Sequence, residues 1–161
     1  MKQLILLAAA WLVLASPAAA QNAGQVATAQ RGASCPGCNL FQANLGGAQL
    51  NGRNFAHARL RQSDLSLSVM NHTSFAGADL RDVDAYGAVF SSANFSGADL
   101  THASFVGTFL EGASFSGARL DGTNFAGAEM TGVRGLTQAQ LDRACGDGST
   151  ALPRGLRIPI C

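Results

Sequence analysis

A large apolar residue recurs at every fifth position between residues 40 and 130, and this period constrains the fold more than any other feature. Eighteen of the nineteen positions divisible by five are Leu, Phe or Met, and the exception is Ala85. Two residues before each stands a mostly small residue, usually Ala. Two residues after it, Gly occurs in eleven of the nineteen cases. The chain therefore needs a backbone that brings every fifth residue to one interior.

The regular structures do not meet this need. On an α-helix, steps of five residues rotate by about 500°, so the large residues would spiral around every face. In a flat strand, consecutive large residues would lie on opposite faces. A chain that turns a corner every five residues points the small and the large residue inward, and Gly, Asn or Ser occupy the bend. Four such sides close a coil of about 20 residues.

Residues 20 positions apart support four sides rather than three. If coils stack, such residues touch, and two of the four columns are uniform. One column holds Leu40, Leu60, Leu80, Leu100 and Leu120, and another holds Phe55, Phe75, Phe95 and Phe115. Low-complexity disorder is excluded because disordered chains lack enough apolar residues to fold. The sequence predicts an all-β solenoid.

The repeats resemble the pentapeptide-repeat family, in stretches such as FAGADL, NFSGADL and SFSGARL. The resemblance covers residues 39–132 and implies a right-handed quadrilateral β-helix of about four to five coils. Ala85 and Arg53 depart from the pattern. Because Arg53 stands at an inward small position, we expect it to distort its coil or to lie at an open end.

The flanking segments complete the predicted domain organisation. Lys2, the apolar run Leu4 to Ala15 and the small residues 18–20 are typical of a signal peptide. The run is too short for a retained anchor, which needs about 20 apolar residues. We therefore expect an exported protein, periplasmic or secreted, with no membrane contact after cleavage. The predicted parts are a signal peptide (1–20), a flexible lead-in without apolar periodicity (21–34), the β-helix (35–132), and a C-terminal helix and tail cap (133–161).

The C-terminal segment is expected to cover the last coil, because the ends of a solenoid expose core side chains and unpaired backbone. Thr137 and Gln140 have the spacing of a capping box, in which each side chain bonds the backbone of the other. Leu136, Leu141 and Ala144 then share one face of a short α-helix.

Four cysteines, Cys35, Cys38, Cys145 and Cys161, allow three pairings. The ends of the repeat lie roughly 20 Å or more apart at the spacing of β-strands, whereas a disulfide needs Cα atoms within about 7 Å. The pairs Cys35–Cys38 and Cys145–Cys161 are favoured, unless the tail folds back along the coil. A redox role for Cys35 and Cys38, or a zinc site, is the alternative, although no thioredoxin-type βαβ setting is visible.

Other polar residues show no catalytic constellation. His57, His72 and His102 each follow a large residue by two positions, so they belong to outward bends on different sides or coils. Asp79 and Asp99 stack in one column, where a carboxylate pair either binds a cation or is plain surface charge. We expect no enzymatic activity, no cofactor and no metal.

Six apolar residues stand where the repeat favours polar ones. Val69, Val89 and Phe109 occupy consecutive rungs of one outward column. The corner between the second and third sides holds Leu67, Tyr86 and Val106. Monomers seldom expose such a strip without reason. The strip either binds a protein partner or a second copy, or is covered by the apolar tail, residues 152–160.

These features favour an exported, non-catalytic scaffold with an unknown partner. A thiol–disulfide redox protein using Cys35 and Cys38 is the alternative. A gyrase-protecting DNA mimic, which the resemblance brings in as a remote alternative, needs a strongly acidic rod. Residues 40–132 hold eight acidic residues against five Arg, a net charge of −3. We expect no nucleic-acid partner.

Overall fold

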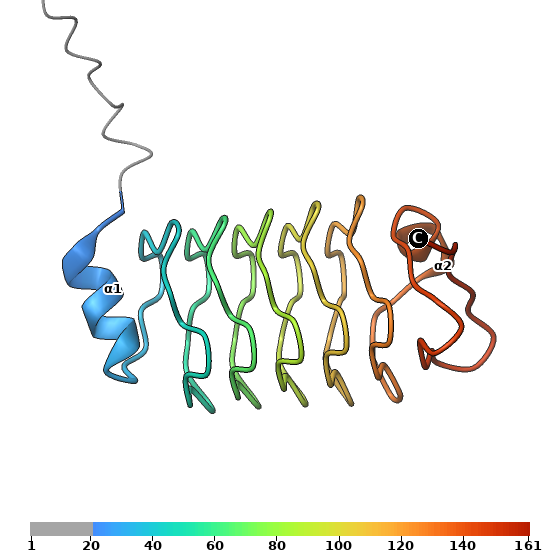
Figure 1. Cartoon of the computed structure of the whole chain (residues 1–161), viewed down its shortest axis with the longest axis horizontal. Helices are drawn as coiled ribbons and strands as arrows, with labels where there is room; N and C mark the ends of the chain where they lie inside the picture. The colour runs from blue at the N-terminus through green and yellow to red at the C-terminus, as the bar shows by residue number, and fades with distance from the viewer. Residues whose placement is uncertain (1–20) are drawn as a thin grey trace, which may run out of the picture.

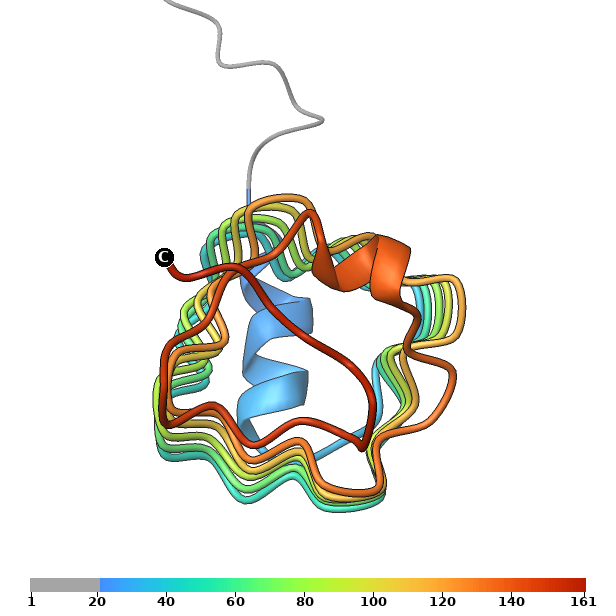
Figure 2. The ribbon, with the colours of Figure 1, turned by 90° about the vertical axis from the view of Figure 1, so that its right-hand side faces the viewer.

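The computed structural model describes residues 21–161 and forms a stack of four-sided coils (Figures 1 and 2). The predicted signal peptide, residues 1–20, lies outside the described residues. Isolated parallel bridges join residues 20 positions apart, from Asn39 with Arg59 to Ser114 with Arg134. Each side of a coil contributes one bridged residue, so the sheets are built from short rungs. The predicted winding of 20 residues per coil is confirmed.

The core contains the residues at every fifth position. Phe95 is fully buried, and its ring stacks on Phe75 and Phe115 with centroid distances of 5.2 and 5.1 Å. Leu80 is also fully buried within its Leu column. Rings from neighbouring sides meet edge to face, as Phe90 does with Phe95 at 5.4 Å. Like residues therefore pack on like residues along the axis of the solenoid, with aromatic geometries that favour contact.

Hydroxyl groups replace Ala at some inward positions without leaving an unsatisfied polar atom. The Ser63 hydroxyl donates to the Leu60 carbonyl at 2.6 Å, and the Thr108 hydroxyl donates to the Phe105 carbonyl at 2.8 Å. Thr73 and Thr123 instead donate to carbonyls of the preceding coil. A buried hydroxyl is tolerated because its hydrogen bond offsets the loss of water.

The second residue of most bends has a positive φ, whatever its identity. Gly117 has a φ of 66°, and His57 has a φ of 58° at the same kind of position. Gly adopts this conformation without a steric cost, whereas a side chain adds strain there. The frequency of Gly after each large residue follows from this geometry.

Replacing Gly117 with Ala is expected to lower the free energy of unfolding by about 1 kcal/mol. A Cβ at Gly117 meets no atom within 4 Å, so the effect isolates the backbone conformation. Gly148→Ala is the matched control, because Gly148 also has open space but no positive φ. Urea unfolding measures both variants. Equal effects would contradict this account of the bends.

Residues 21–34 do not form the predicted flexible lead-in, because they contain helix α1, Ala23–Gln30. The Asn22 side chain caps it by accepting from the Gln25 amide at 3.1 Å. Val26 and Ala29 are buried, and α1 lies across the N-terminal end of the stack (Figures 1 and 2). The Gln25 side-chain oxygen accepts from the Asn39 amide at 2.6 Å. Helix α1 thus supplies a hydrogen-bond acceptor to the backbone of the first coil, which has no preceding coil to bond.

The C-terminal end contains helix α2, Gln138–Leu141, and the tail. The predicted capping box between Thr137 and Gln140 is present. The Gln140 side chain donates to the carbonyls of Phe115 and Ala118, both at 2.9 Å. Further along, Cys145 bridges Asn124 and Ala151 bridges Glu129, so the chain adds parts of one more coil.

Candidate functional site

The six residues of the apolar strip lie on neighbouring rungs of two adjoining parts of the surface. Val69 bridges Val89, and Val89 bridges Phe109, so these three form one column along the axis. At the adjoining corner, the Leu67 amide donates to the Tyr86 carbonyl at 2.8 Å, and the Gly87 amide donates to the Val106 carbonyl at 2.9 Å. The structure therefore brings together all six residues that the sequence grouped: Leu67, Val69, Tyr86, Val89, Val106 and Phe109.

The strip is open on its outer side. Leu67 is 62% exposed, Tyr86 is 56% exposed and Phe109 is 53% exposed. Among residues 21–161, the remaining large apolar residue exposed to this degree is Ile160. Val69, Val89 and Val106 are half-buried between them. Three of the four exposed large apolar side chains of the described chain thus gather in one place.

The tail does not cover the strip, so the alternative that it folds back over these residues is wrong. Ala151 bridges Glu129 and so adds one more rung to this wall of the solenoid. It does not lie over the outer face of the wall. Leu152 and Ile158 pack against the core cluster, and the tail crosses the C-terminal end of the stack (Figure 2). The bridge between Gly146 and Ile160 holds the last residues at that end.

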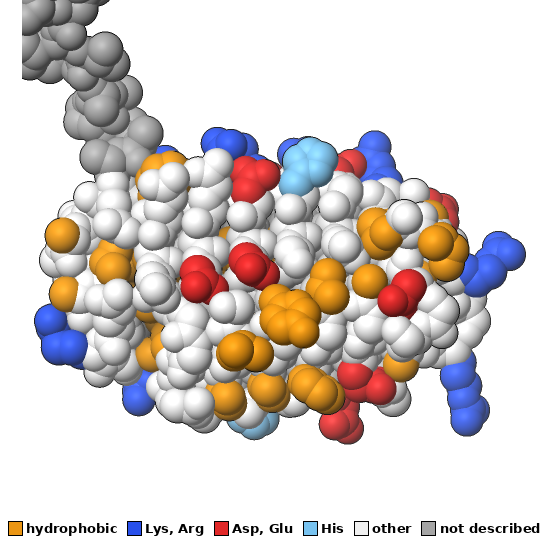
Figure 3. Space-filling model, viewed as in Figure 1, with side chains coloured by type: hydrophobic (Ala, Val, Ile, Leu, Met, Phe, Trp, Pro, Cys, Tyr) orange, Lys and Arg blue, Asp and Glu red, His pale blue; other side chains and the backbone are white. Residues whose placement is uncertain are grey.

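Acidic residues border the strip, and basic residues do not. The half-coils that bear it are residues 43–52, 63–72, 83–92, 103–112 and 123–132. They contain Asp64, Asp84, Glu111 and Glu129 but no Lys or Arg. In the face shown in Figure 3, apolar side chains gather between acidic ones, and basic side chains appear only along the outline. Within the described chain, none of these four carboxylates takes part in an ion pair.

Each carboxylate next to the corner also serves the fold, but this role does not require its charge. Asp84 accepts a hydrogen bond from the Tyr86 amide at 3.0 Å, which fixes the bend. On the same wall, Asn124 accepts from the Ala126 amide at 2.9 Å and Asn44 accepts from the Gly46 amide at 3.1 Å. An amide oxygen therefore performs the same structural task on the rungs just beyond Leu67 and Val106.

The other half of each coil carries paired charges. Residues 53–62, 73–82, 93–102 and 113–122 hold four acidic residues and five Arg. Arg81 contacts Asp79 at 2.6 Å and Asp99 at 4.0 Å. The hydrogen bond from Arg81 lowers the pKa of Asp79 from its ordinary value, and the same bond raises the pKa of Arg81. The stacked Asp79 and Asp99 thus share a guanidinium, a role for Arg81 that the sequence did not reveal.

Arg53 lies on the first complete coil and is exposed. Its coil retains the regular ladder, because the Ser74 amide donates to the Arg53 carbonyl at 2.8 Å. Of the two expectations for Arg53, a place near an open end of the solenoid therefore fits the structure better than a distorted coil.

Asp147 forms a small polar cluster near the C-terminal end. It accepts from the Ser149 hydroxyl at 2.7 Å and from the Gly127 amide at 3.0 Å. These bonds favour the ionised carboxylate and hold its pKa at about 2. Folding then gains stability from this group above its ordinary pKa, and the gain is lost as the pH falls toward 2.

The remaining polar groups form no arrangement suited to acid–base or metal chemistry in the described residues. His57, His72 and His102 all lie at bends with positive φ. In residues 21–161 no three His, Cys, Asp or Glu side chains converge as a metal site. A shallow groove of about 480 Å³ is lined by Ser96, Ser114, Ser116 and Arg134 among others, without a His or carboxylate to act as a base.

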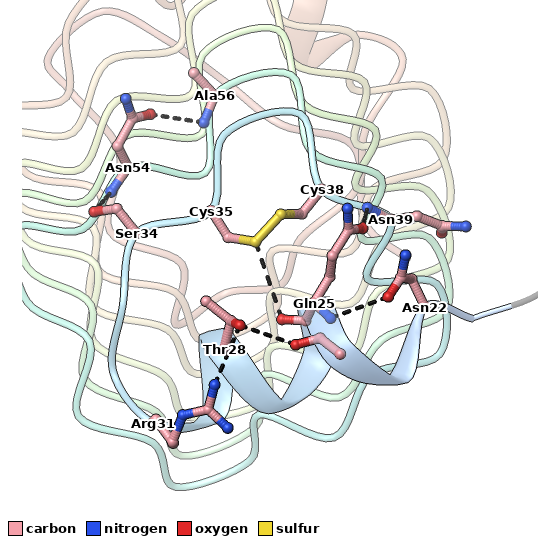
Figure 4. The surroundings of a disulfide bond; sticks show 11 residues. Asn22, Gln25, Thr28, Arg31, Ser34, Cys35, Cys38, Asn39, Asn54 and Ala56 are labelled. Carbon is pink, nitrogen blue, oxygen red and sulfur yellow. Dashed lines mark hydrogen bonds between the residues drawn. A yellow bond between two sulfur atoms is a disulfide. The ribbon is translucent and has the colours of Figure 1, made fainter.

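The structure pairs Cys35 with Cys38 and Cys145 with Cys161, the pairing that the sequence favours. Figure 4 shows the first disulfide, whose two cysteines belong to the first coil and face α1. Cys35 is 5% exposed and Cys38 is 7% exposed, and the Cys35 sulfur lies 4.0 Å from the Gln25 carbonyl oxygen. A reactive thiol must be accessible, so this burial disfavours the thiol–disulfide alternative.

Comparison with known proteins identifies the repeat. A model of pentapeptide repeats matches residues 54–91 and 93–132 in eight copies, which implies a right-handed quadrilateral β-helix. No curated protein matches the chain. None of the helices in the described part is long and apolar enough to cross a membrane.

Solved structures of low similarity are also found. Rfr23, a pentapeptide repeat protein from the cyanobacterium Cyanothece 51142, is 22% identical, with coverage of 68% of this chain and 90% of that one, at a TM-score of 0.46. HetL, from the cyanobacterium Nostoc sp. strain PCC 7120 and involved in heterocyst differentiation regulation, is 28% identical. The match covers 71% of this chain and 57% of HetL, at a TM-score of 0.42. QnrB1, a plasmid-mediated fluoroquinolone resistance protein, is 15% identical, with coverage of 75% and 79% and a TM-score of 0.41.

Proposed function

Because this chain belongs to the pentapeptide-repeat family, we propose that it is an exported, non-catalytic scaffold that binds another protein through the apolar strip. In this proposal residues 35–132 are a solenoid of about four to five coils. Helix α1 closes its N-terminal end, and residues 133–161 close the other. Export places the mature protein in the periplasm or outside the cell.

The exposure of the strip is the observation that carries this proposal. Leu67, Tyr86 and Phe109 expose more than half of their surface, and the tail lies elsewhere. Contiguous exposed apolar patches on soluble proteins are typical of interaction sites. The regular ladder beneath the strip holds it rigid, so binding costs little conformational entropy in the scaffold.

Two disulfides support the proposed export. Disulfides persist in oxidising compartments and are rare in the cytosol. Both lie at the ends of the solenoid: Cys35–Cys38 closes a short loop in the first coil, and Cys145–Cys161 joins two parts of the C-terminal segment. A structural role for both fits a small exported domain better than a catalytic one.

Site-specific photocrosslinking in the producing cell tests the proposed function. A photoreactive phenylalanine analogue at Phe109 is expected to give a discrete adduct of higher mass. The same probe at Arg119, on the opposite half of the coil and also exposed, is the control and is expected to give none. Leu67→Ser/Tyr86→Ser should abolish the Phe109 adduct while leaving the melting temperature within a few degrees.

Equal adducts at Phe109 and Arg119, or an adduct that survives Leu67→Ser/Tyr86→Ser, would contradict the proposal. An adduct of twice the mass of the chain would show that the strip binds a second copy rather than another protein. Recovery of the protein in the cytosolic fraction would contradict export.

A further inference from the structure

We propose that the partner of the strip is an amphipathic protein segment that carries Lys or Arg beside its large apolar residues. This inference rests on the proposed function and adds the chemistry of the partner. It follows from the charges around the strip, which are all of one sign.

The charge distribution between the two halves of each coil is unequal. The half that bears the strip holds four carboxylates and no cation, whereas the other half holds four carboxylates and all five Arg of residues 40–132. On that other half, Arg61 pairs with Asp82 at 3.0 Å, and Arg119 lies 3.6 Å from Asp121. The carboxylates beside the strip have no such counterion in the described chain.

The fold does not demand these charges. On the wall next to the corner, the residues in successive rungs are Asn44, Asp64, Asp84, Ser104 and Asn124. The Asn residues make the same bond to the bend as Asp84 does. The carboxylates occur on the rungs of Leu67 and Tyr86, the two exposed corner residues. On this wall the carboxylates thus lie beside Leu67 and Tyr86, and neutral Asn or Ser occupies the neighbouring rungs.

Several kinds of occupant are disfavoured by this pattern. In a two-fold dimer the same surface meets itself, so Asp84 and Glu111 of one copy would approach acidic residues of the other. Like charges across an interface oppose binding. An anionic lipid surface is repelled for the same reason. A segment with apolar residues in its centre and cations at its rim satisfies both the strip and its border.

The length of the strip along the axis of the solenoid suits a short protein segment. Val69, Val89 and Phe109 lie on three successive rungs, which are about 4.8 Å apart in β-structures. The strip therefore spans about two turns of an α-helix, enough for two or three anchoring side chains. Asp64 and Asp84 border it on one side and Glu111 borders it on the other, while Glu129, which bridges Phe109, stands at the end of the column.

Two synthetic peptides test this inference by fluorescence anisotropy. One is an amphipathic helix-forming peptide of Leu and Lys, and the other has Glu at every Lys. We expect the Lys peptide to bind the mature protein at least about tenfold more tightly. We also expect this preference to shrink when the salt concentration rises, because salt screens exposed charges.

Matched variants separate the charge from the apolar surface. Asp84→Asn/Glu111→Gln is expected to weaken binding of the Lys peptide about tenfold, since it removes two charges beside the strip. Asp121→Asn/Asp142→Asn removes two charges elsewhere and should leave the affinity within about twofold. Tyr86→Ser/Phe109→Ser should weaken binding of the Lys peptide at least about tenfold.

The outcomes distinguish the two proposals. If both peptides bind equally and Tyr86→Ser/Phe109→Ser weakens both, the inferred basic partner is wrong but the strip remains a binding surface. If Tyr86→Ser/Phe109→Ser leaves binding unchanged, or if neither peptide binds, the inference is overturned. An equal loss in the Asp121→Asn/Asp142→Asn control would show attraction by net charge alone, which also overturns it.

Discussion

Replacing Phe95 with Ala is expected to lower the free energy of unfolding by about 3–5 kcal/mol. Phe95 is fully buried, and its ring contacts those of Phe75, Phe90, Phe105 and Phe115 at centroid distances between 5.1 and 5.7 Å. The truncation removes buried apolar surface and leaves a cavity. The hydrogen-bonded rungs around this position cannot move inward to close it. Urea unfolding monitored by circular dichroism measures the loss.

Phe109→Ala is the matched control, because Phe109 has the same side chain on the outside of the same solenoid. It is 53% exposed, so its truncation is expected to cost about 1 kcal/mol or less. If Phe95→Ala were no more destabilising than Phe109→Ala, the stacked interior would not be the main source of stability.

The second large effect is expected from removing the disulfide between Cys145 and Cys161. These cysteines are 16 residues apart, and closing such a loop in the unfolded chain contributes about 3 kcal/mol on the chain-entropy model. The variant Cys145→Ser/Cys161→Ser leaves no free thiol at this end. It should unfold at a lower urea concentration than the native protein.

Hydrogen exchange locates this second effect. The Gly146 amide donates to the Pro159 carbonyl at 2.8 Å, and the Cys161 amide donates to the Gly146 carbonyl at 2.9 Å. Both amides should lose protection in Cys145→Ser/Cys161→Ser, since only the disulfide closes this loop covalently. The Leu60 amide, which bonds Asp79 on an internal coil, is the internal control. Equal loss of protection at Leu60 would show that the whole solenoid, rather than its end, depends on this disulfide.

The interior could be predicted because one short period describes it. Burying every fifth residue requires bends at fixed positions, and uniform columns such as Phe75 with Phe95 indicate which residues stack. The strip was predictable for the same reason, since the register that places Phe95 inside places Phe109 outside. Both follow from local pattern and from the distance between rungs.

Helix α1 and the path of the tail escaped prediction because neither segment follows a period. Helix α1 buries little more than Val26 and Ala29, too few residues for an apolar stripe to be visible in the sequence. Its position depends on Gln25, whose side chain bonds the first coil. The tail has apolar residues that suit either the end or the strip, and packing of Leu152 and Ile158 on the core decides between them.

Asp84 and Asn124 hold their bends with the same kind of bond to a backbone amide. The exterior of such a protein can therefore exchange anionic for neutral residues rung by rung while the interior stays as it is. Recognition and folding are encoded at alternating positions of one short motif. Substitutions at the outward positions of a single column can therefore give a protein of this fold a new binding partner.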